Sequence, residues 1–177
     1  YTFFNMYGGS VTNNTASEKG GGILIANNTW GNQDVFFIHG TITVKDNTCG
    51  TSANNVHLMS YVYNTLTYNR HININDNLSS STRIGVTVEG APRAFTSGLS
   101  GHGSTTNFFP DDATAYSVTL DDNNEAFLKK YIFSVAITSI EAPSATKSFD
   151  TSAYCSTEGV ASKSVAWKKG TTTVTGY

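Results

Sequence analysis

The sequence NNTASEKGGGILI at residues 13–25 and the sequence DNTCGTSANNVHL at residues 46–58 decide how this chain folds. Each contains an Asn-Thr pair, at Asn14 or Asn47, and each reaches an apolar triplet nine residues after that asparagine. The two copies are offset by 33 residues. A repeat of this length, built from short apolar segments, predicts a solenoid in which stacked units share one continuous core.

Further pieces of the repeat flank these two copies. The segments GSVT at residues 9–12 and GTIT at residues 40–43 precede them and match each other. A weaker third copy covers residues 72–77, and Ile84 follows Asn75 by nine residues. Asparagines at equivalent positions of successive units are expected to form side-chain amide ladders, as in other stacked parallel strands.

Cys49 stands where the first copy has Ala16. A position that accepts alanine in one unit favours a small buried side chain in the next. We therefore expect Cys49 to be inside, reduced and not bonded to Cys155, because two distant cysteines make no disulfide framework.

Strand patterns fill most of the remaining sequence. Short runs alternate apolar and polar residues, and clusters of Gly and Asn separate them. The best helical window, residues 121–130, is short. The sequence thus predicts an all-β fold, with strands at Ile23–Ile25, Val35–Ile38, Thr41–Val44, Val56–Leu58, His71–Ile74, Ile84–Val88, Tyr116–Leu120, Ile132–Ile140, Ser164–Trp167 and Thr171–Thr175.

A shared core makes a specific packing prediction. Apolar side chains from every unit should point into one column, with the residues between them facing outward. The expected members are Val11, Ile23, Ile25, Ile42, Val44, Val56, Leu58, Ile72, Ile74, Ile84, Val86 and Val88.

The run NMYGGSVTNNTASEKGGGILI at residues 5–25 resembles the GGSIT-N-TA-GGG-I repeats of bacterial β-helix surface proteins, the polymorphic outer-membrane and adhesin-like group. The resemblance covers about residues 1–128 and implies a right-handed parallel β-helix with its closing segment over residues 1–130. It also implies a secreted protein of the bacterial cell surface. The function expected from it is a non-catalytic stalk or adhesive segment; the alternatives are a self-assembling extracellular filament subunit and a glycan-binding or carbohydrate-active β-helix.

From residue 131 the sequence changes character. Residues 131–177 resemble the opening strands of a bacterial immunoglobulin-like module, with Trp167 as a core aromatic residue. A complete sandwich of that kind needs roughly 100 residues. Apolar residues in too few strands predict self-association through this C-terminal segment.

Composition excludes several classes of partner. Charged residues make up 14% of the chain, the net charge is −2, and no basic run is present. Nucleic-acid binding needs a concentrated positive field, so none is expected. No apolar run approaches the roughly 18 residues of a membrane-spanning helix.

Pairs of carboxylates are the candidate catalytic groups, because glycosidases use two facing acids. Asp46 and Asp76 are the best pair, at what we take to be equivalent corners of adjacent units. The simpler interpretation is that both cap turns, so we expect no enzyme and no catalytic residue. The other acids considered are Asp34, Asp111, Asp112, Asp121, Asp122 and Glu125.

No cofactor is expected. Calcium is the one alternative, at Asp111-Asp112 or at residues 121–125, although the second cluster is equally suited to capping a helical turn that runs to Lys130. The four histidines share no metal-ligand spacing. Among them, His57 and His71 lie in strand patterns and should face outward.

Three tyrosines form one candidate contact site, and the loop from Phe95 to Phe109 is another. Tyr61, Tyr63 and Tyr68 have Asn64 and Asn69 between and beside them. The commoner explanation of such a segment is an extended loop that covers the side of the solenoid. The alternative is a contact site for a host or cell-wall glycan or a protein ligand, because aromatic faces suit sugar rings and protein interfaces.

Overall fold

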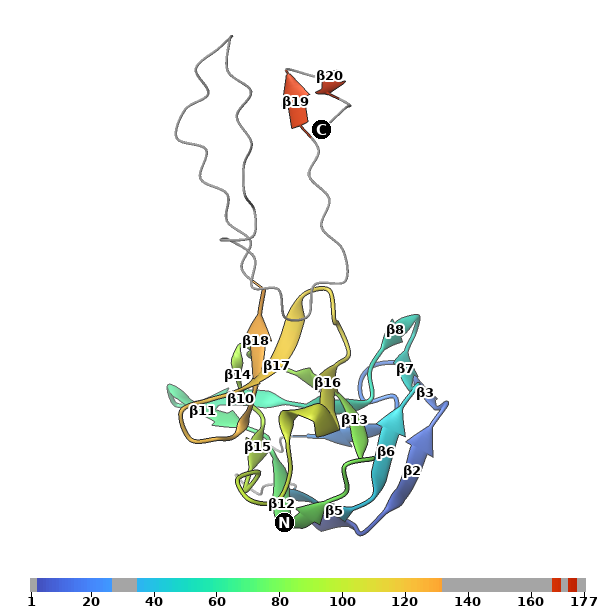
Figure 1. Cartoon of the computed structure of the whole chain (residues 1–177), viewed down its shortest axis with the longest axis vertical. Coiled ribbons are helices and arrows are strands. Elements are labelled where there is room, and N and C mark those ends of the chain that lie inside the picture. The colour runs from blue at the N-terminus through green and yellow to red at the C-terminus, as the bar shows by residue number, and fades with distance from the viewer. Residues whose placement is uncertain (1–2, 27–34, 132–166, 170–171, 175–177) are drawn as a thin grey trace. The chain divides into compact units, whose positions relative to one another are not determined.

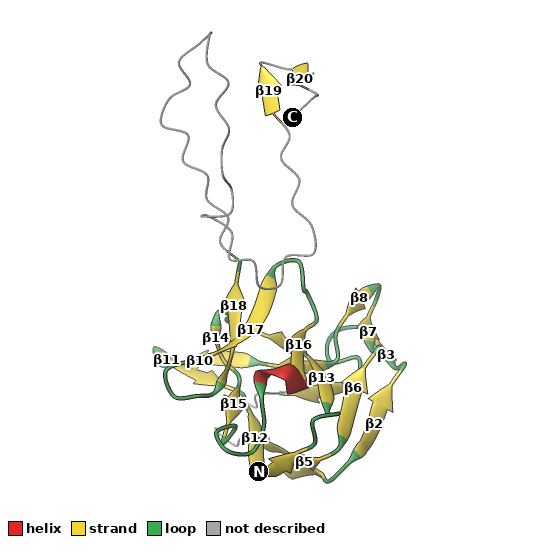
Figure 2. Cartoon of the chain, viewed as in Figure 1, coloured by secondary structure: helices red, strands yellow, loops and turns green. Residues whose placement is uncertain are grey.

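The computed structural model describes residues 3–26, 35–131, 167–169 and 172–174. The chain divides into two compact units, residues 1–131 and 132–177, and each is described by itself. The described residues are all-β, as predicted, with parallel sheets (Figures 1 and 2). Their one helical element is the short 3-10 turn η1, Thr105–Asn107.

In the first unit, four successive stretches of the chain contribute strands to shared parallel sheets, and we call these stretches layers. Layer 1 contains β1 (Phe3–Met6), β2 (Gly9–Thr12), β3 (Thr15–Ala16) and β4 (Ile23–Ile25). Layer 2 contains β5 (Val35–Gly40), β6 (Ile42–Lys45), β7 (Thr48–Cys49), β8 (Ser52–Ala53) and β9 (Val56–Leu58). Layer 3 contains β12 (Ile72–Leu78) and β13 (Arg83–Val88), and layer 4 contains β15 (Thr96–Ser97) and β16 (Phe108–Pro110).

Parallel pairing between layers builds the sheets. One sheet has the order β1-β5-β12-β15, one strand from each layer. A second has the order β2-β6-β13-β9-β4, with β16 also paired to β13. In Figure 1, β2, β6 and β13 lie side by side in layer order. A small third sheet has the order β3-β7-β8, in which β8 turns back antiparallel to β7.

The register between layers 1 and 2 confirms the 33-residue repeat at its centre. Ala16 pairs with Cys49, and Ile23 pairs with Val56. The predicted match of residues 9–12 with residues 40–43 is wrong by two positions, because Gly9 pairs with Ile42. The two glycines are not equivalent: Gly40, with a left-handed backbone (φ 77°), ends β5, whereas Gly9 begins β2.

Layer 3 departs from the repeat. β13 pairs with β6 through Ile84 and Val44, then with β9 through Val86 and Val56. Gly85 alone therefore replaces the excursion that layer 2 makes through β7 and β8. The predicted third copy is wrong in register, since residues 72–77 lie in β12 and pair with β5.

The prediction of one shared column is confirmed. All of its twelve expected members belong to or pack against a single hydrophobic cluster, with Val11 partly buried at its margin. Phe36, Ile38, Phe95 and Phe108 enlarge that cluster. Burying each such side chain stabilises the fold by about 1.5–3 kcal/mol, so the column is the main source of stability.

A three-stranded antiparallel sheet closes the far end of the stack. It comprises β14 (Arg93–Ala94), β17 (Tyr116–Leu120) and β18 (Ala126–Lys130), in the order β14-β18-β17. The helical window predicted at residues 121–130 is wrong. β18 alternates buried Ala126 and Leu128 with more exposed neighbours, so its period is that of a strand.

The prediction for the second unit falls largely outside the described residues. The structure describes there only β19 (Trp167–Lys169) and β20 (Thr172–Val174), which pair antiparallel. Cys155 also lies outside the described residues.

Candidate functional site

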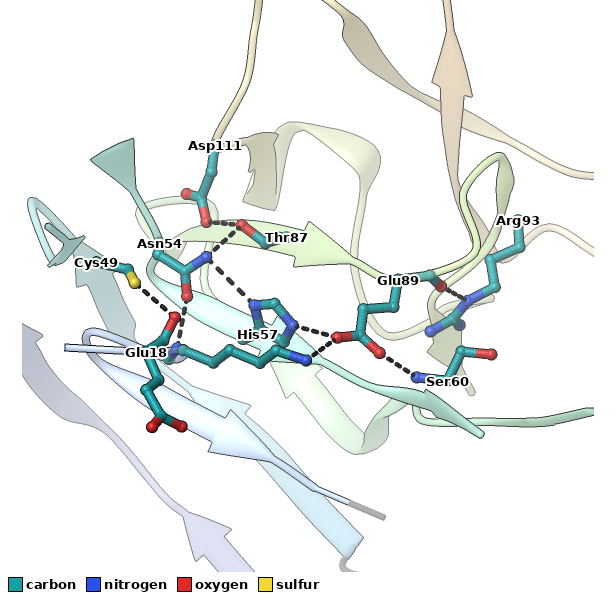
Figure 3. Close-up of polar contacts among 11 residues, drawn as sticks. Glu18, Cys49, Asn54, His57, Ser60, Thr87, Glu89, Arg93 and Asp111 are labelled. Atoms are coloured by element: carbon teal, nitrogen blue, oxygen red, sulfur yellow. Dashed lines mark hydrogen bonds and ion pairs between the residues drawn. The ribbon is translucent and has the colours of Figure 1, made fainter. Parts of the chain in front are cut away.

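A cluster of polar side chains crosses three layers on the outer face of the sheet that contains β4, β9 and β13 (Figure 3). Register produces it: Leu24, His57 and Thr87 are neighbours across those strands, so their side chains share the face opposite the core. Lys19 and Glu89 complete the cluster from the segments beside β4 and β13. We call the polar residues Lys19, Asn54, His57, Thr87 and Glu89 the cross-layer cluster.

Glu89 is its centre. Its carboxylate accepts hydrogen bonds from Lys19 Nζ at 2.6 Å, from His57 Nε2 at 3.0 Å and from the Ser60 backbone N–H at 3.1 Å. Burial alone would raise the pKa of Glu89, but these hydrogen bonds and the charge of Lys19 outweigh it and lower the pKa to about 2. Glu89 therefore ties layer 3 to layers 1 and 2 as an anion.

His57 faces away from the core, as expected, but it is buried rather than exposed, at 6%. Its Nδ1 accepts from Asn54 Nδ2 at 3.2 Å, while Nε2 donates to Glu89. Both ring nitrogens are thus occupied. General acid–base catalysis by a histidine needs a ring nitrogen within reach of a substrate proton, and His57 has none free. The nearby Ser60 hydroxyl does not hydrogen-bond to His57, because it donates to Asn69.

His71 is only half-buried. Burial lowers its pKa, and the charges of Arg93 and Arg70 lower it further, against the opposing effect of Glu125. His71 is therefore neutral at physiological pH.

Lys19 also lines a shallow, open groove of about 370 Å³ together with Leu24 and Met59. Because its ammonium group is bound to Glu89 at 2.6 Å, Lys19 offers this groove no free charge for an anionic ligand.

A second polar chain runs through the stack beside the core. The side-chain oxygen of Asn47 accepts from the backbone N–H and the side-chain amide of Asn14, 33 residues earlier. Asn47 donates in the same way to Asn55, and Asn55 donates to Asp111. The expected amide ladder between equivalent asparagines is confirmed for Asn14 and Asn47. From Asn47 the chain of hydrogen bonds continues through Asn55 of the same layer to the carboxylate of Asp111.

The predicted pairing of Asp46 and Asp76 is wrong. Asp46 follows β6 with a left-handed backbone (φ 59°), and its counterpart in layer 1 is Asn13 (φ 60°). Asp76 lies in the irregular part of β12, where its carboxylate accepts from the backbone N–H of Asn77. The two acids occupy different corners because residues 72–77 belong to another sheet. Asp34 lies outside the described residues.

The other acids are engaged in local turns and caps. Asp112 accepts from Thr114 and Ala115, and these hydrogen bonds lower its pKa. Asp121 accepts from the N–H groups of Asn123 and Glu125, which makes the β17–β18 turn rather than the predicted helix cap. Within the described part of the chain, no group of three or more His, Cys, Asp or Glu residues is arranged to hold a metal ion.

Cys49 has the predicted counterpart, Ala16, but not the predicted burial. It is half-buried in β7, the middle strand of the small β3-β7-β8 sheet, and its thiol donates to the carbonyl oxygen of Glu18. The alanine that it replaces is also only partly buried, so the sequence match was right and the inference from it to the core was wrong.

Comparison of the chain with family models, with curated proteins and with solved structures gives no match. The described residues contain no helix with the length and apolarity needed to cross a membrane.

The three candidate tyrosines lie together on a β-hairpin made of β10 (Ser60–Tyr63) and β11 (Leu66–Asn69). Its two-residue turn, Asn64-Thr65, has positive φ at both positions, the geometry that suits the twist of a hairpin. The predicted extended covering loop is wrong in conformation.

One face of this hairpin is aromatic and uncharged. Tyr61 stands opposite Tyr68, and Tyr63 stands opposite Leu66. The rings of Tyr61 and Tyr63 are nearly parallel, 16° apart, with centroids 6.3 Å apart. Tyr63 is 53% exposed and Leu66 is 60% exposed. We call Tyr61, Tyr63, Leu66 and Tyr68 the tyrosine face.

Sequence reasoning found the tyrosines but missed Leu66 and the cross-layer cluster. Leu66 could have been predicted, because it lies two residues before Tyr68 and alternate residues of a strand share one face once the hairpin turn is recognised. Glu89 carries no such signal, because the offset from β9 to β13 is 30 residues and not 33.

Proposed function

We propose that residues 1–130 form a right-handed parallel β-helix that serves as a non-catalytic structural or adhesive segment of a large secreted bacterial cell-surface protein. The observation that carries the proposal is the stack of parallel layers around one core. Such a stack gives a rigid, repetitive body, and parallel crossovers are overwhelmingly right-handed. The resemblance of residues 5–25 to the adhesin-like group supplies the surface setting.

Polar side chains that are already hydrogen-bonded within the chain favour a structural role over catalysis. His57, Glu89 and Asp111 each bind neighbouring layers of the same chain. A carbohydrate-active enzyme needs two acids facing a substrate across a cleft.

Incubation with pectin, alginate and other polyuronides tests the non-catalytic role. We expect no turnover by the wild-type chain, and the Asp46→Asn/Asp76→Asn double variant should behave like wild type. Turnover that this double variant abolishes would overturn the proposal.

The tyrosine face favours a second, compatible function, binding of a glycan or protein ligand. Flat aromatic surfaces stack well on sugar rings, and the hairpin carries no charge to repel a neutral sugar. Glycan-array binding should be lost in Tyr63→Ala. Tyr7→Ala is the matched control, because Tyr7 is 72% exposed but packs edge-to-face against His39 outside the hairpin.

Surface location has a direct test. Antibodies raised against residues 1–131 should label intact cells of the source bacterium without permeabilisation. Labelling only after lysis would remove the secreted, cell-surface assignment.

We also propose that residues 131–177 begin an immunoglobulin-like domain and self-associate through their strands. Sedimentation of the full chain and of a chain ending at Lys130, over a range of concentrations, tests this. Association should occur only in the full chain, and a full chain that stays monomeric throughout would contradict it.

A further inference from the structure

The hydrogen bonds of Asn54 fix the orientation of its side-chain amide. Asn54 Oδ1 accepts from the Gly20 backbone N–H at 2.6 Å. A backbone N–H can only donate, so the atom that it meets must be the amide oxygen. The amide nitrogen therefore faces the other way, where it lies 3.2 Å from Thr87 Oγ1 and 3.2 Å from His57 Nδ1 (Figure 3). Both N–H groups of the amide act as donors there.

Thr87 holds the amide in this orientation. The single hydroxyl proton of Thr87 is donated to Asp111 Oδ2 at 2.7 Å, which leaves Thr87 Oγ1 able only to accept from Asn54. The series of donors runs in one direction, from Asn54 in layer 2 through Thr87 in layer 3 to Asp111, which follows β16 of layer 4. Because Asn54 also binds Gly20 in layer 1, the series reaches all four layers.

This arrangement accepts only one form of the His57 ring. Because Asn54 presents an N–H to His57 Nδ1, that nitrogen carries no proton, and the ring proton is on Nε2, which donates to Glu89 Oε1 at 3.0 Å. A proton added at Nδ1 would point at an amide nitrogen that already donates. Since His57 is buried, water does not supply the missing acceptor, and a buried donor without a partner is costly.

Charged groups around His57 make the ring responsive to acid. Glu89 faces Nε2 and favours a positive ring, whereas Lys19 binds the same carboxylate oxygen at 2.6 Å and opposes it. Asp111 is the carboxylate at the end of the donor series, and Arg93 binds the backbone oxygen of Glu89. The pKa of Glu89 is lowered to about 2, so Glu89 stays an anion well below neutral pH. Histidine is the side chain that ordinarily changes charge between about pH 5 and 8.

We propose that the cross-layer cluster is an acid-sensitive latch, which binds layer 1 to layers 2 and 3 while His57 is neutral and opens when His57 Nδ1 takes up a proton. The amide of Asn54 then turns over, so that Oδ1 accepts from the new Nδ1–H. The Gly20 N–H loses its acceptor, and Thr87 loses its donor. The segment of layer 1 beside Gly20 is loosened, while the hydrophobic column keeps its contacts. The inference rests on hydrogen bonds within the chain and does not need the surface role proposed above.

Nuclear magnetic resonance of the full chain, titrated from about pH 8 to about pH 4, tests the latch across the range in which histidines change charge. At the upper end, the ring nitrogens of His57 should show a neutral ring protonated on Nε2. On acidification, the His57 ring and the Gly20 amide should change with the same midpoint. Exchange of the Gly20 amide, corrected for its intrinsic dependence on pH, should rise about five-fold, the effect of one lost hydrogen bond. The amides of Ile42 and Val44, in the buried strand β6, should not change.

Variants separate the latch from a merely structural contact. His57→Gln removes the titrating ring, so the Gly20 amide should no longer respond to pH in this range. Asn54→Asp places a carboxylate oxygen on each side, so that His57 can be protonated while Gly20 keeps its acceptor. His57 should still titrate in that variant, but the Gly20 amide should not follow it. His39→Gln is the matched control, because His39 packs against Tyr7 outside the cluster, and it should leave the Gly20 response intact.

Several results would overturn the proposal. One is a wild-type His57 ring protonated on Nδ1 at the upper end of the titration, and another is a His57 that titrates without any change at Gly20. A Gly20 response that persists in His57→Gln or in Asn54→Asp would do the same. So would a folded wild-type chain in which His57 never titrates above about pH 4. Loss of the whole fold in this range would also contradict it, because the latch opens locally.

Discussion

The two ends of the layered stack are built differently, although both consist of β-strands. At the far end, β17 and β18 cover the core, and Glu125 accepts hydrogen bonds from the Gly98 and Leu99 N–H groups and from the Thr96 hydroxyl. At the near end, among the described residues, β2 and β4 of layer 1 are the terminal strands of their sheet, and no antiparallel sheet packs on them. The comparison shows that specific residues, above all Glu125, build the cap at the far end.

Truncation of a leucine at each end should show the largest difference. Leu128→Ala in β18 removes a side chain that is 3% exposed and should cost about 2–5 kcal/mol of the free energy of unfolding, because it leaves a cavity. Leu24→Ala in β4 removes one that is 43% exposed and should cost less than about 1 kcal/mol. Urea denaturation of both variants measures the difference, and equal losses would show that the Leu24 side chain is packed as tightly as that of Leu128.

Asparagine substitutions compare the middle of the ladder with its open end. Asn47→Ala should cost about 2–3 kcal/mol, since Asn47 is fully buried and its loss leaves polar groups of Asn55 and Val11 without a partner. Asn14→Ala should cost about 0.5–1 kcal/mol, because its exposed side can be solvated. Thermal and urea unfolding provide the values. An Asn14→Ala cost as large as that of Asn47→Ala would mean that the ladder continues past Asn14.

Neutralising the cap should loosen only the far end. Glu125→Gln weakens charge-assisted hydrogen bonds to Gly98 and Leu99 and should cost about 1–2 kcal/mol. Glu18→Gln, at an exposed position, is the control and should be neutral. Hydrogen exchange should accelerate at the Gly98 and Leu99 amides. Faster exchange throughout layer 1 would contradict the local nature of this cap.

The cross-layer cluster, between the two ends, predicts a smaller and pH-dependent effect. The folded pKa of Glu89, about 2, lies below its ordinary value of 4.5. Its contribution to stability is therefore complete above about pH 4.5 and is lost as the pH falls from there towards 2. We expect about 1 kcal/mol after solvent screening is allowed for. Glu89→Gln should flatten the unfolding free energy across that range, and an unchanged slope would exclude Glu89 as its source.

Sequence reasoning succeeded where the repeat is regular. The offset of 33 residues places Cys49 against Ala16 and Val56 against Ile23, and the register has both pairs. It failed where tertiary context overrides the local pattern. Residues 121–130 look helical because Asp121 and Lys130 suit helix ends, but pairing of β18 with β14 and β17 makes them a strand and a turn.

The same limit applies to the candidate site. Tyr61, Tyr63 and Tyr68 were identifiable because alternation brings them to one face once the hairpin turn is recognised. Lys19, His57 and Glu89 were not, because they come from three layers whose spacing is unequal. Asp46 and Asp76 were wrongly joined for the same reason: counting residues assumes one period, and layer 3 does not keep it.

Gly85 has a consequence for how such a chain tolerates insertions. Eleven residues separate Val44 from Val56 in layer 2, whereas Gly85 alone separates Ile84 from Val86 in layer 3, yet both ends of the gap pair in register. A side chain at position 85 would collide with Asn55 and Asp111, which fill the space beside it. The corner thus accommodates either a full excursion or a bare glycine. Foreign peptides inserted between Gly50 and Thr51, in the turn that joins β7 to β8, would be displayed on the flank of the stack while the strands on either side kept their partners.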